Sequence, residues 1–355
     1  MSSVEFFGHR FDEKIKTKLS NAELAQIIAD KPFRELNSIL VEAFKEKATK
    51  IRPSDILKRH EEIKEYYEAS TIDQRELINF ELMFYQNVPR EFQAVELSPV
   101  TPLGLNSVLT KISQNNSLSA IRNSEVVSDP TTALALECAT KRQKKIKDND
   151  PVSQINLATS QRVLRLQPFD KDKGYMQHFT LFALCSGGRD IARRPFMLNA
   201  TRNHISIWLD FIKDIKNKGN LINEISVNLS DVNIMEQLIT FFNIPRNIII
   251  ANSLNENYDF FQQHNINLPK EILLDNISAS MLSQYGIEDK IFYLSMLNNE
   301  IIQPLQTKYP NVKFCFDLNR KAGLGYYKNV CFHIFAKNAQ NRKAQLVDGG
   351  SVDWL

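Results

Sequence analysis

The stretch that decides the fold reads RKAGLGYYKNVCFHIFA, from Arg320 to Ala336. Its second half is an apolar run with the length and composition of a β-strand. VKFCFDLN (312–319) precedes it and AQLVDGG (344–350) follows it, and both have the same character. The C-terminal part of the chain is therefore predicted to form three strands joined by short links.

A β-hairpin is predicted further upstream. RVLRLQPF (162–169) and GYMQHFTLFALCS (174–186) are two apolar runs that flank the charged turn DKDKG. Another strand is expected over 222–231. Most of 233–310 has a helical pattern, with NIIIANSL (247–254) as a candidate strand.

The first seventy residues are predicted to be helical. Ser20 is placed to cap a helix over 22–30, and a later helix is expected over 54–70 with Ser54 as its cap. Residues 1–72 are therefore interpreted as a helical N-terminal extension. Such an extension either packs on the main domain or serves as an RNA-binding arm.

The order of these elements favours an α+β fold. Short strands and helices follow one another without the regular alternation of a doubly wound sheet, so we expect an antiparallel β-sheet flanked by helices. Residues 73–355 would form this core. Within it, about 200–310 would be a mostly helical insertion between the hairpin and the C-terminal strands.

Composition excludes several classes of protein. The 44 basic and 41 acidic residues leave a net charge of +3, too little for a dominant nucleic-acid surface. The basic cluster KRQKKIK (141–147) is either a solvated helix end or a patch that contacts phosphates. Only 11 glycines occur, and none forms a Walker or Rossmann loop. The N-terminus is too charged for a signal peptide and no long apolar run follows, which predicts a cytoplasmic protein with no membrane contact.

The four cysteines are far apart in the sequence. They are Cys138, Cys185, Cys315 and Cys331. No CxxC pair or ligand-spaced histidine accompanies them, so we expect reduced thiols, with no disulfide framework, no zinc and no other metal site.

The C-terminal stretch resembles a signature of class II aminoacyl-tRNA synthetases of the histidyl type, RGLDYYTGTVFE. The residues at matching positions are Gly323, Leu324, Tyr326, Tyr327, Val330 and Phe332. LVDGGSVDWL (346–355) is similar to GGRYDGL, the next strand and turn of that family. The resemblance implies the antiparallel catalytic core of a class II synthetase.

Three upstream segments extend this resemblance over roughly residues 73–355. RLQPFDKDKGYMQHFTLF (165–182) resembles motif 2 of the class, and SDPTTALAL (128–136) is similar to the family's RPEGTA segment. The passage that ends in Pro99 looks like motif 1, which builds the dimer interface in that family, so a homodimer is implied. The matching residues in the first two segments are Arg165, Gly174, Phe179, Phe182 and Thr132.

The resemblance implies a nucleotide site with ATP and Mg²⁺ as cofactors. Arg165 matches the arginine that grips the α-phosphate, and Phe179 matches the aromatic residue that stacks on adenine. When an amino-acid carboxylate attacks that phosphorus, charge builds on the phosphate oxygens, and preorganised cations must stabilise it. Arginine suits this task because its planar fork holds two oxygens at once.

Several family positions carry a different residue here. Gln167 stands in place of the motif 2 glutamate, Gln177 in place of the return-strand arginine, and Cys185 in place of an acidic residue that reads the substrate. Ala322 replaces the catalytic arginine. Arg320 is two positions away, a shift of about 6.6 Å along a strand. Whether Arg320 supplies the missing catalytic cation stays open.

The expected ligand-binding residues follow from the same alignment. The resemblance assigns the catalytic role to Arg165 and Arg320, and nucleotide binding to Arg165, Gln167 and Phe179. The substrate positions are Thr132, Gln177, Cys185, Tyr326 and Tyr327. The two tyrosines either line a small-ligand pocket or divide between core and surface, since neighbouring strand residues face opposite sides.

The altered positions favour a protein that does not charge tRNA by the usual route. Motif 3 would follow residue 355 in the family, and an anticodon-binding domain would come after the core. We therefore expect a small-ligand-binding or regulatory subunit with a partner enzyme, as in the histidyl-type regulatory subunit of ATP phosphoribosyltransferase. Two alternatives remain: an ATP-dependent amino-acid adenylating ligase, and an accessory protein that binds nucleic acid.

Overall fold

The computed structural model describes residues 20–167, 176–190, 194–219, 222–253, 255 and 258–354. Gly174, one of the residues that match motif 2, lies outside these ranges. So do residues 1–19 of the expected extension and Leu355.

The C-terminal strands belong to a five-stranded sheet. Its order is β11 (Lys343–Gly350), β10 (Val330–Lys337), β7 (Glu224–Asp231), β9 (Val312–Asp317) and β8 (Glu271–Ile272). Neighbouring strands are antiparallel except for β7 and β9, which run parallel. The three predicted C-terminal strands are confirmed, although β10 begins only at Val330.

One face of this sheet is apolar and the other is polar. Phe332 and Ile334 of β10 are 2% and 0% exposed and lie in the main core. His333 alternates with them, so it faces the opposite side, where it stands opposite Asn228 and Asp348. The strands thus present a row of polar side chains on the face that is turned away from the core.

A hairpin forms a second sheet as predicted, but its first strand was placed wrongly, since this strand begins seven residues before 162 and ends at Leu164. β5 (Ile155–Leu164) pairs antiparallel with β6 (His178–Gly187), and the short strand β1 (Gln93–Ala94) runs parallel to β5. Helix α8 (Pro130–Lys147) covers one face of this hairpin. On the other face, helices α6 (Gln74–Asn87) and α9 (Pro195–Asn217) pack through Phe84 and Phe211 against Phe182.

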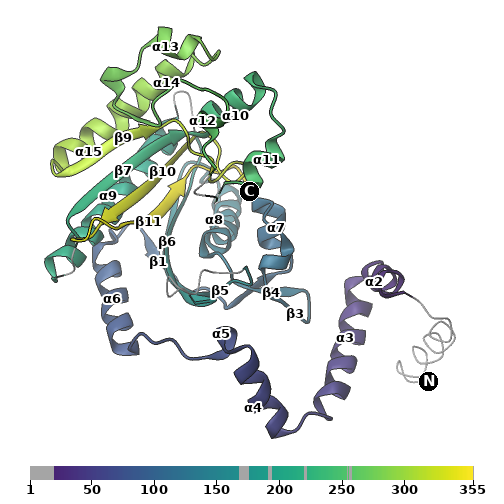
Figure 1. Ribbon diagram of the computed structural model, residues 1–355. Coiled ribbons are helices and arrows are strands. Elements are labelled where there is room, and N and C mark those ends of the chain that lie inside the picture. Colours follow the sequence, from purple (N-terminus) through teal and green to yellow (C-terminus); the bar gives the residue numbers. More distant parts are fainter. Residues whose placement is uncertain are drawn as a thin grey trace.

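A third, small sheet precedes α8. It has the order β2 (Val100–Pro102), β4 (Ser124–Val126) and β3 (Ser119–Ala120). Helix α7 (Leu105–Thr110) and a 3₁₀ turn, η1 (Gln114–Asn116), lie between these strands in the sequence. Together they form a compact unit beside the start of α8 (Figure 1).

The interval predicted as a helical insertion also contains β7, which is the central strand of the five-stranded sheet. The interval is therefore an integral part of the core. Its other elements are most of α9 (Pro195–Asn217), the short strand β8, and the helices and turns α10 (Val232–Phe241), α11 (Arg246–Ala251), α12 (Phe260–Gln263), η3 (Leu274–Asn276), α13 (Ala279–Ser283), α14 (Lys290–Leu297), a π-helical turn η4 (Asn298–Ile302) and α15 (Gln303–Lys308).

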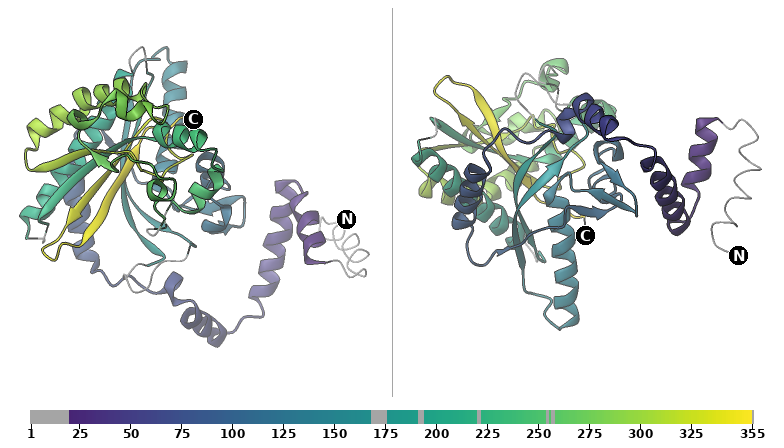
Figure 2. Two further views of the ribbon diagram at one scale, coloured as in Figure 1. Left: turned by 45° about the horizontal axis from the view of Figure 1, so that its top comes forward. Right: turned by 90° about the horizontal axis from the view of Figure 1, so that it is seen from below.

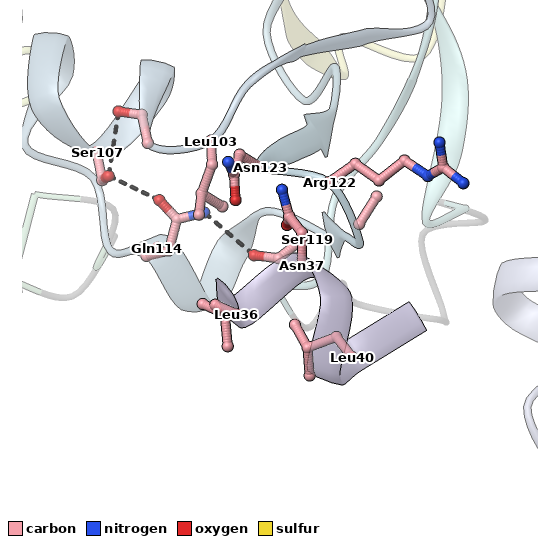
Figure 3. A pocket seen from close by; sticks show the side chains of 11 residues that line it. Leu36, Asn37, Leu40, Leu103, Ser107, Gln114, Ser119, Arg122 and Asn123 are labelled. Atoms are coloured by element: carbon pink, nitrogen blue, oxygen red, sulfur yellow. Dashed lines mark hydrogen bonds between the residues drawn. The ribbon is translucent and has the colours of Figure 1, made fainter. Parts of the chain in front are cut away.

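The N-terminal helices form an arm that stands away from the core (Figures 1 and 2). They are α2 (Asn21–Ala29), α3 (Phe33–Ala48), α4 (Pro53–Glu62) and α5 (Lys64–Tyr67), and none of their residues is buried. The arm approaches the core where the carbonyl oxygen of Glu68 lies 2.8 Å from Nε2 of His178. A cavity of about 480 Å³ lies between α3 and the small sheet unit (Figure 3).

The predicted caps and strands were partly wrong. Ser20 caps α2 as expected, and the carboxylate of Glu23 completes the capping box. The later helix begins at Pro53, however, because proline suits the first helical position and Asp55 accepts a hydrogen bond from the backbone N–H of Arg52 at 3.0 Å. Ser54 is therefore not its cap.

The segment 247–254 is not a strand. Its described part contains the end of α11, where Ile249 is fully buried while Ile248 and Ile250 are each 42% exposed. Burial of only the middle isoleucine would also fit a strand. The first residue of α11, however, is fixed by a contact with another helix. The guanidinium of Arg246 binds the carboxylate of Glu236 at 2.7 Å, which fixes the start of α11 on α10.

Phe84 is expected to be essential for the packing of α6 on the core. Its side chain is fully buried and its ring lies 4.7 Å from Phe182 and 5.4 Å from Trp208. Phe84→Ala should lower the free energy of unfolding by about 3–5 kcal/mol because it leaves a cavity. Phe292→Ala, at a side chain that is 81% exposed, should change it by less than about 0.5 kcal/mol. Urea unfolding of both variants measures the difference, and equal losses would contradict this packing.

Candidate functional site

The candidate site starts at the first turn of α8. Asp129 caps this helix, with Oδ1 accepting a hydrogen bond from the backbone N–H of Thr131 at 2.8 Å. Pro130 takes the first helical position, where a missing N–H costs nothing. The other carboxylate oxygen of Asp129 accepts a hydrogen bond from the hydroxyl of Tyr326 at 3.0 Å. This contact ties the loop before β10 to α8.

A buried polar network holds this turn in place. The hydroxyl of Thr132 lies 2.8 Å from Oδ1 of Asn106 and 2.9 Å from the carbonyl oxygen of Asp129. The side-chain amide of Asn106 in turn donates to the hydroxyl of Ser128. Thr132 is 1% exposed. Its hydroxyl is therefore engaged within the protein and supports the turn.

Glu125 is the centre of the same network. Its carboxylate is fully buried and accepts hydrogen bonds from the backbone N–H of Gly104, the backbone N–H of Asn106 and the side-chain amide of Gln114, at 2.9, 3.2 and 2.6 Å. Gln114 also accepts a hydrogen bond from the hydroxyl of Ser107 at 2.7 Å. Both residues line the cavity between α3 and the small sheet unit (Figure 3). Hydrogen bonds thus connect that cavity with the start of α8.

Arg165 joins the hairpin to this turn. Its Nε donates to the carbonyl oxygen of Ser128 at 2.8 Å, and its guanidinium carbon lies 5.4 Å from the centre of the Phe179 ring. The backbone N–H of Arg165 donates to the carbonyl oxygen of Gln177 at 2.8 Å. The structure therefore places Arg165, Gln177 and Phe179 next to one another, while their role in ligand binding stays a prediction. Gln167 lies partly buried just beyond β5.

Arg320 lies on the other side of the site and is buried. Its side chain is 2% exposed, its Nη2 lies 2.6 Å from the carboxylate of Asp348, and its Nε donates to the carbonyl oxygen of Ala322 at 3.0 Å. The guanidinium also stacks on the ring of Tyr327, 5.3 Å from its centre. Nη1 has no hydrogen-bond partner among the described residues.

Asp348 balances this buried cation. Burial alone would raise its pKa, but His333 and Arg320 outweigh burial and hold the pKa of Asp348 at about 2. The hydroxyl of Tyr327 donates to the same carboxylate at 2.9 Å. Burial would lower the pKa of Arg320, but the nearby groups Cys331, Asp348 and Tyr327 outweigh burial and raise this pKa, so the guanidinium stays charged. The pair is therefore ionised at neutral pH.

Tyr326 and Tyr327 pack against each other with ring centres 4.7 Å apart, and the ring of Trp354 lies 4.8 Å from Tyr326. Burial and nearby carboxylates raise the pKa of both tyrosines, so both hydroxyls act as hydrogen-bond donors. Gly323, at φ +89°, makes this turn compact, because a Cβ there would meet the Tyr327 ring at 2.5 Å.

Cys185 is not part of this chain of contacts. It lies six residues along β6 from Phe179, where it packs with α8 in a small apolar cluster. The chain of contacts itself runs through residues that the sequence prediction did not include, namely Ser128, Asp129 and Asp348. The proline after Asp129 was a local signal for a helix cap, but no sequence signal shows that Asp348 pairs with Arg320.

Among known proteins, no protein-family model matches the chain. A histidine–tRNA ligase of Saccharolobus islandicus is 25% identical over 169 residues, which cover 41% of this chain and 38% of that protein. The chain thus matches well under half the length of this curated relative.

Solved structures give a broader match. A histidine–tRNA ligase subunit from Alicyclobacillus acidocaldarius aligns with a TM-score of 0.55 at 10% identity, covering 81% of this chain and 88% of that one. A protein from Bacillus halodurans described as an ATP phosphoribosyltransferase regulatory subunit/histidyl-tRNA synthetase aligns with a TM-score of 0.53 at 16% identity, covering 79% and 73%. The chain therefore has a class II synthetase-like fold.

Within that class, the relatives are of the histidyl type, both in sequence and in structure. The expected fold class is confirmed, with the difference that the strands form separate sheets with two parallel pairings. In the part of the chain that the structure describes, no cluster of three or more His, Cys, Asp or Glu could hold a metal ion. No described helix has the length and apolar character to cross a membrane.

Asp348→Asn should destabilise the protein because it leaves Arg320 buried without a counter-ion. We expect a loss of about 1–3 kcal/mol at pH 7, reduced from the value for a fully buried pair because the Asp348 side chain is 37% exposed. Asp353→Asn, whose exposed carboxylate lies 3.4 Å from Lys328, should cost less than about 0.5 kcal/mol.

The same pair predicts a pH dependence. A carboxylate with a depressed pKa stabilises the fold above its unfolded pKa of about 3.9, and the stabilisation is lost as the pH falls toward 2. Urea unfolding between pH 5 and pH 2 should therefore show a steeper loss in the wild type than in Asp348→Asn. Parallel curves would contradict the ionised pair.

Proposed function

We propose that the protein is a histidyl-tRNA synthetase paralogue that binds a small ligand, an amino acid or a nucleotide, and acts as a regulatory subunit of a partner enzyme. The observation that carries this proposal is the pairing of Arg320 with Asp348 at 2.6 Å. The residue at the family's catalytic arginine position is Ala322. Arg320 is the nearest arginine before it in the sequence, and its charge is already neutralised by Asp348. Such a site supplies little free positive charge for a developing phosphate transition state.

The chain's own residues fit a nucleotide in part. Arg165 would contact a phosphate group and Phe179 would offer its ring to a base, and the two side chains are already in contact. Mg²⁺ bound with the nucleotide would neutralise phosphate charge. Gln167 supplies an amide where the family has a carboxylate, which weakens the case for a tightly held metal.

The groups around Tyr326 suit a small polar ligand. Asp129 provides a carboxylate, Arg165, which contacts the neighbouring Ser128, provides a cation, and Trp354 provides an aromatic surface. An amino acid carries both charges and would match this mixture. The structural relative from Bacillus halodurans supports a regulatory role, since its description includes a regulatory subunit of ATP phosphoribosyltransferase.

Arg165 should be required for nucleotide binding. In isothermal titration of the full chain with ATP and Mg²⁺, Arg165→Ala should weaken binding tenfold or more, which is about 1.4 kcal/mol. Arg342→Ala removes an exposed arginine in the turn between β10 and β11, at the end of these strands opposite to the site, and this variant should bind like the wild type. Equal ATP affinities in all three proteins would show that Arg165 does not contact the nucleotide.

Amino-acid-dependent pyrophosphate exchange separates the regulatory proposal from an adenylating ligase. We expect no exchange above background with any of the twenty amino acids, even where calorimetry detects ATP. Exchange with one amino acid that is abolished in Arg165→Ala would instead show that the protein is an ATP-dependent ligase, and the regulatory proposal would be wrong.

We propose in addition that the protein forms a homodimer through α6. This helix resembles part of motif 1, and Ile78 and Leu82 are 52% and 56% exposed. They are four residues apart and therefore share one helix face. Leu82→Glu should convert a dimer to a monomer in light scattering, whereas Val152→Glu, at a residue 77% exposed elsewhere, should not. A wild-type monomer would refute this dimer.

A further inference from the structure

Cys138 and Cys185 lie together although 47 residues separate them in the sequence. Cys138 is on α8 and Cys185 is on β6, and both belong to the apolar cluster between these elements. The sulfur of Cys138 lies 3.9 Å from the carbonyl oxygen of Cys185. The helix and the strand therefore bring the two residues into direct contact.

The close approach depends on Gly187. A Cβ at this position would lie 3.2 Å from the Cβ of Cys138 and 3.6 Å from its sulfur. The first of these distances is tighter than an ordinary contact between carbon atoms, so a larger residue would force Cys138 to shift by a few tenths of an ångström. The glycine thus allows Cys138 to reach the strand beside Cys185.

The two thiols also differ in reactivity. The hydrogen bond with the Cys185 thiol is the largest influence on Cys138 and lowers its pKa in spite of burial, and Lys141 lowers it further. The same hydrogen bond, together with burial, raises the pKa of Cys185. Cys138 is thus the more acidic of the two thiols.

The other two cysteines provide an internal contrast. Burial raises the pKa of Cys315 and of Cys331 to about 12. Cys315 donates to Oδ1 of Asn228 at 3.3 Å, and Cys331 is fully buried beneath Tyr327. Neither contacts another thiol among the described residues. They serve as matched controls for the pair between α8 and β6.

We propose that Cys138 and Cys185 form a dithiol site that a low-molecular-weight disulfide oxidises to an intrachain disulfide. The thiolate of Cys138 attacks one sulfur of the reagent, which forms a mixed disulfide on Cys138 and releases one thiol. Cys185 then gives up its proton to solvent, attacks the sulfur of Cys138 and releases the second thiol. Two protein thiols are oxidised, and one reagent disulfide is reduced to two thiols.

The new bond would fasten α8 to β6. It would close a loop that includes the whole of β5 and Arg165. Because Asp129 at the start of α8 contacts Tyr326, oxidation would also limit the movement of the helix that supports the candidate ligand site. The inference does not depend on the proposed function, since it rests only on the contact between the two cysteines.

Oxidised glutathione is the probe that tests the site in the full chain. After incubation at pH 8, intact mass should show the loss of two hydrogens, and a non-reducing digest should contain one cross-linked peptide pair joining Cys138 and Cys185. The thermal unfolding temperature should rise by about 5 °C, as a cross-link restricts the unfolded chain. Dithiothreitol should reverse both changes.

Four variants complete the test. Cys138→Ser and Cys185→Ser should abolish the loss of two hydrogens, whereas Cys315→Ser and Cys331→Ser should retain it. Circular dichroism verifies that each variant is folded, and Cys138→Ala replaces the serine variant if that one is not. No oxidation of the wild type, a glutathione adduct on Cys138 that never resolves, or a cross-link to a different cysteine would each overturn the proposal.

Discussion

The hydrogen bond from Tyr326 to Asp129 links two parts of the protein directly, in addition to the apolar core that the hairpin and the five-stranded sheet share. Asp129 belongs to the first turn of α8, which covers the β5–β6 hairpin, whereas Tyr326 belongs to the turn that leads into β10. Asp129 has a second task, since its other oxygen caps the helix. One carboxylate therefore fixes the helix start and the distance between the groups around Arg165 and those around Arg320.

The site combines rigid support with an unusual distribution of charge. Glu125 is buried without a cation, yet three hydrogen-bond donors satisfy its carboxylate. Arg320 is also buried, and Asp348 neutralises it. Arg165, by contrast, directly follows β5 and lies against Phe179. Glu125 and Arg320 are thus engaged by other groups of the protein. For this reason we favour ligand binding over adenylation.

The sequence was sufficient to predict much of this arrangement and insufficient for the rest. Local signals were only partly reliable: Ser20 caps α2 as predicted, whereas Ser54 does not cap α4, which begins one residue earlier at Pro53. The segment 247–254 misled because three consecutive isoleucines favour a strand by propensity, whereas a contact with α10 decides for a helix. The pairs Arg320–Asp348 and Cys138–Cys185 could not be foreseen, because each depends on tertiary contacts between distant segments.

The absence of buried side chains in α2 to α5 has a consequence for how the molecule opens. Each of these helices is held mainly by its own backbone hydrogen bonds and its caps, so each can unwind without disturbing the sheets. Val330 and Ile334, at 0% exposure in the centre of the core, lose their protection only when the whole domain unfolds. Amide protons of the arm should therefore exchange with solvent on a far shorter timescale than those of β10.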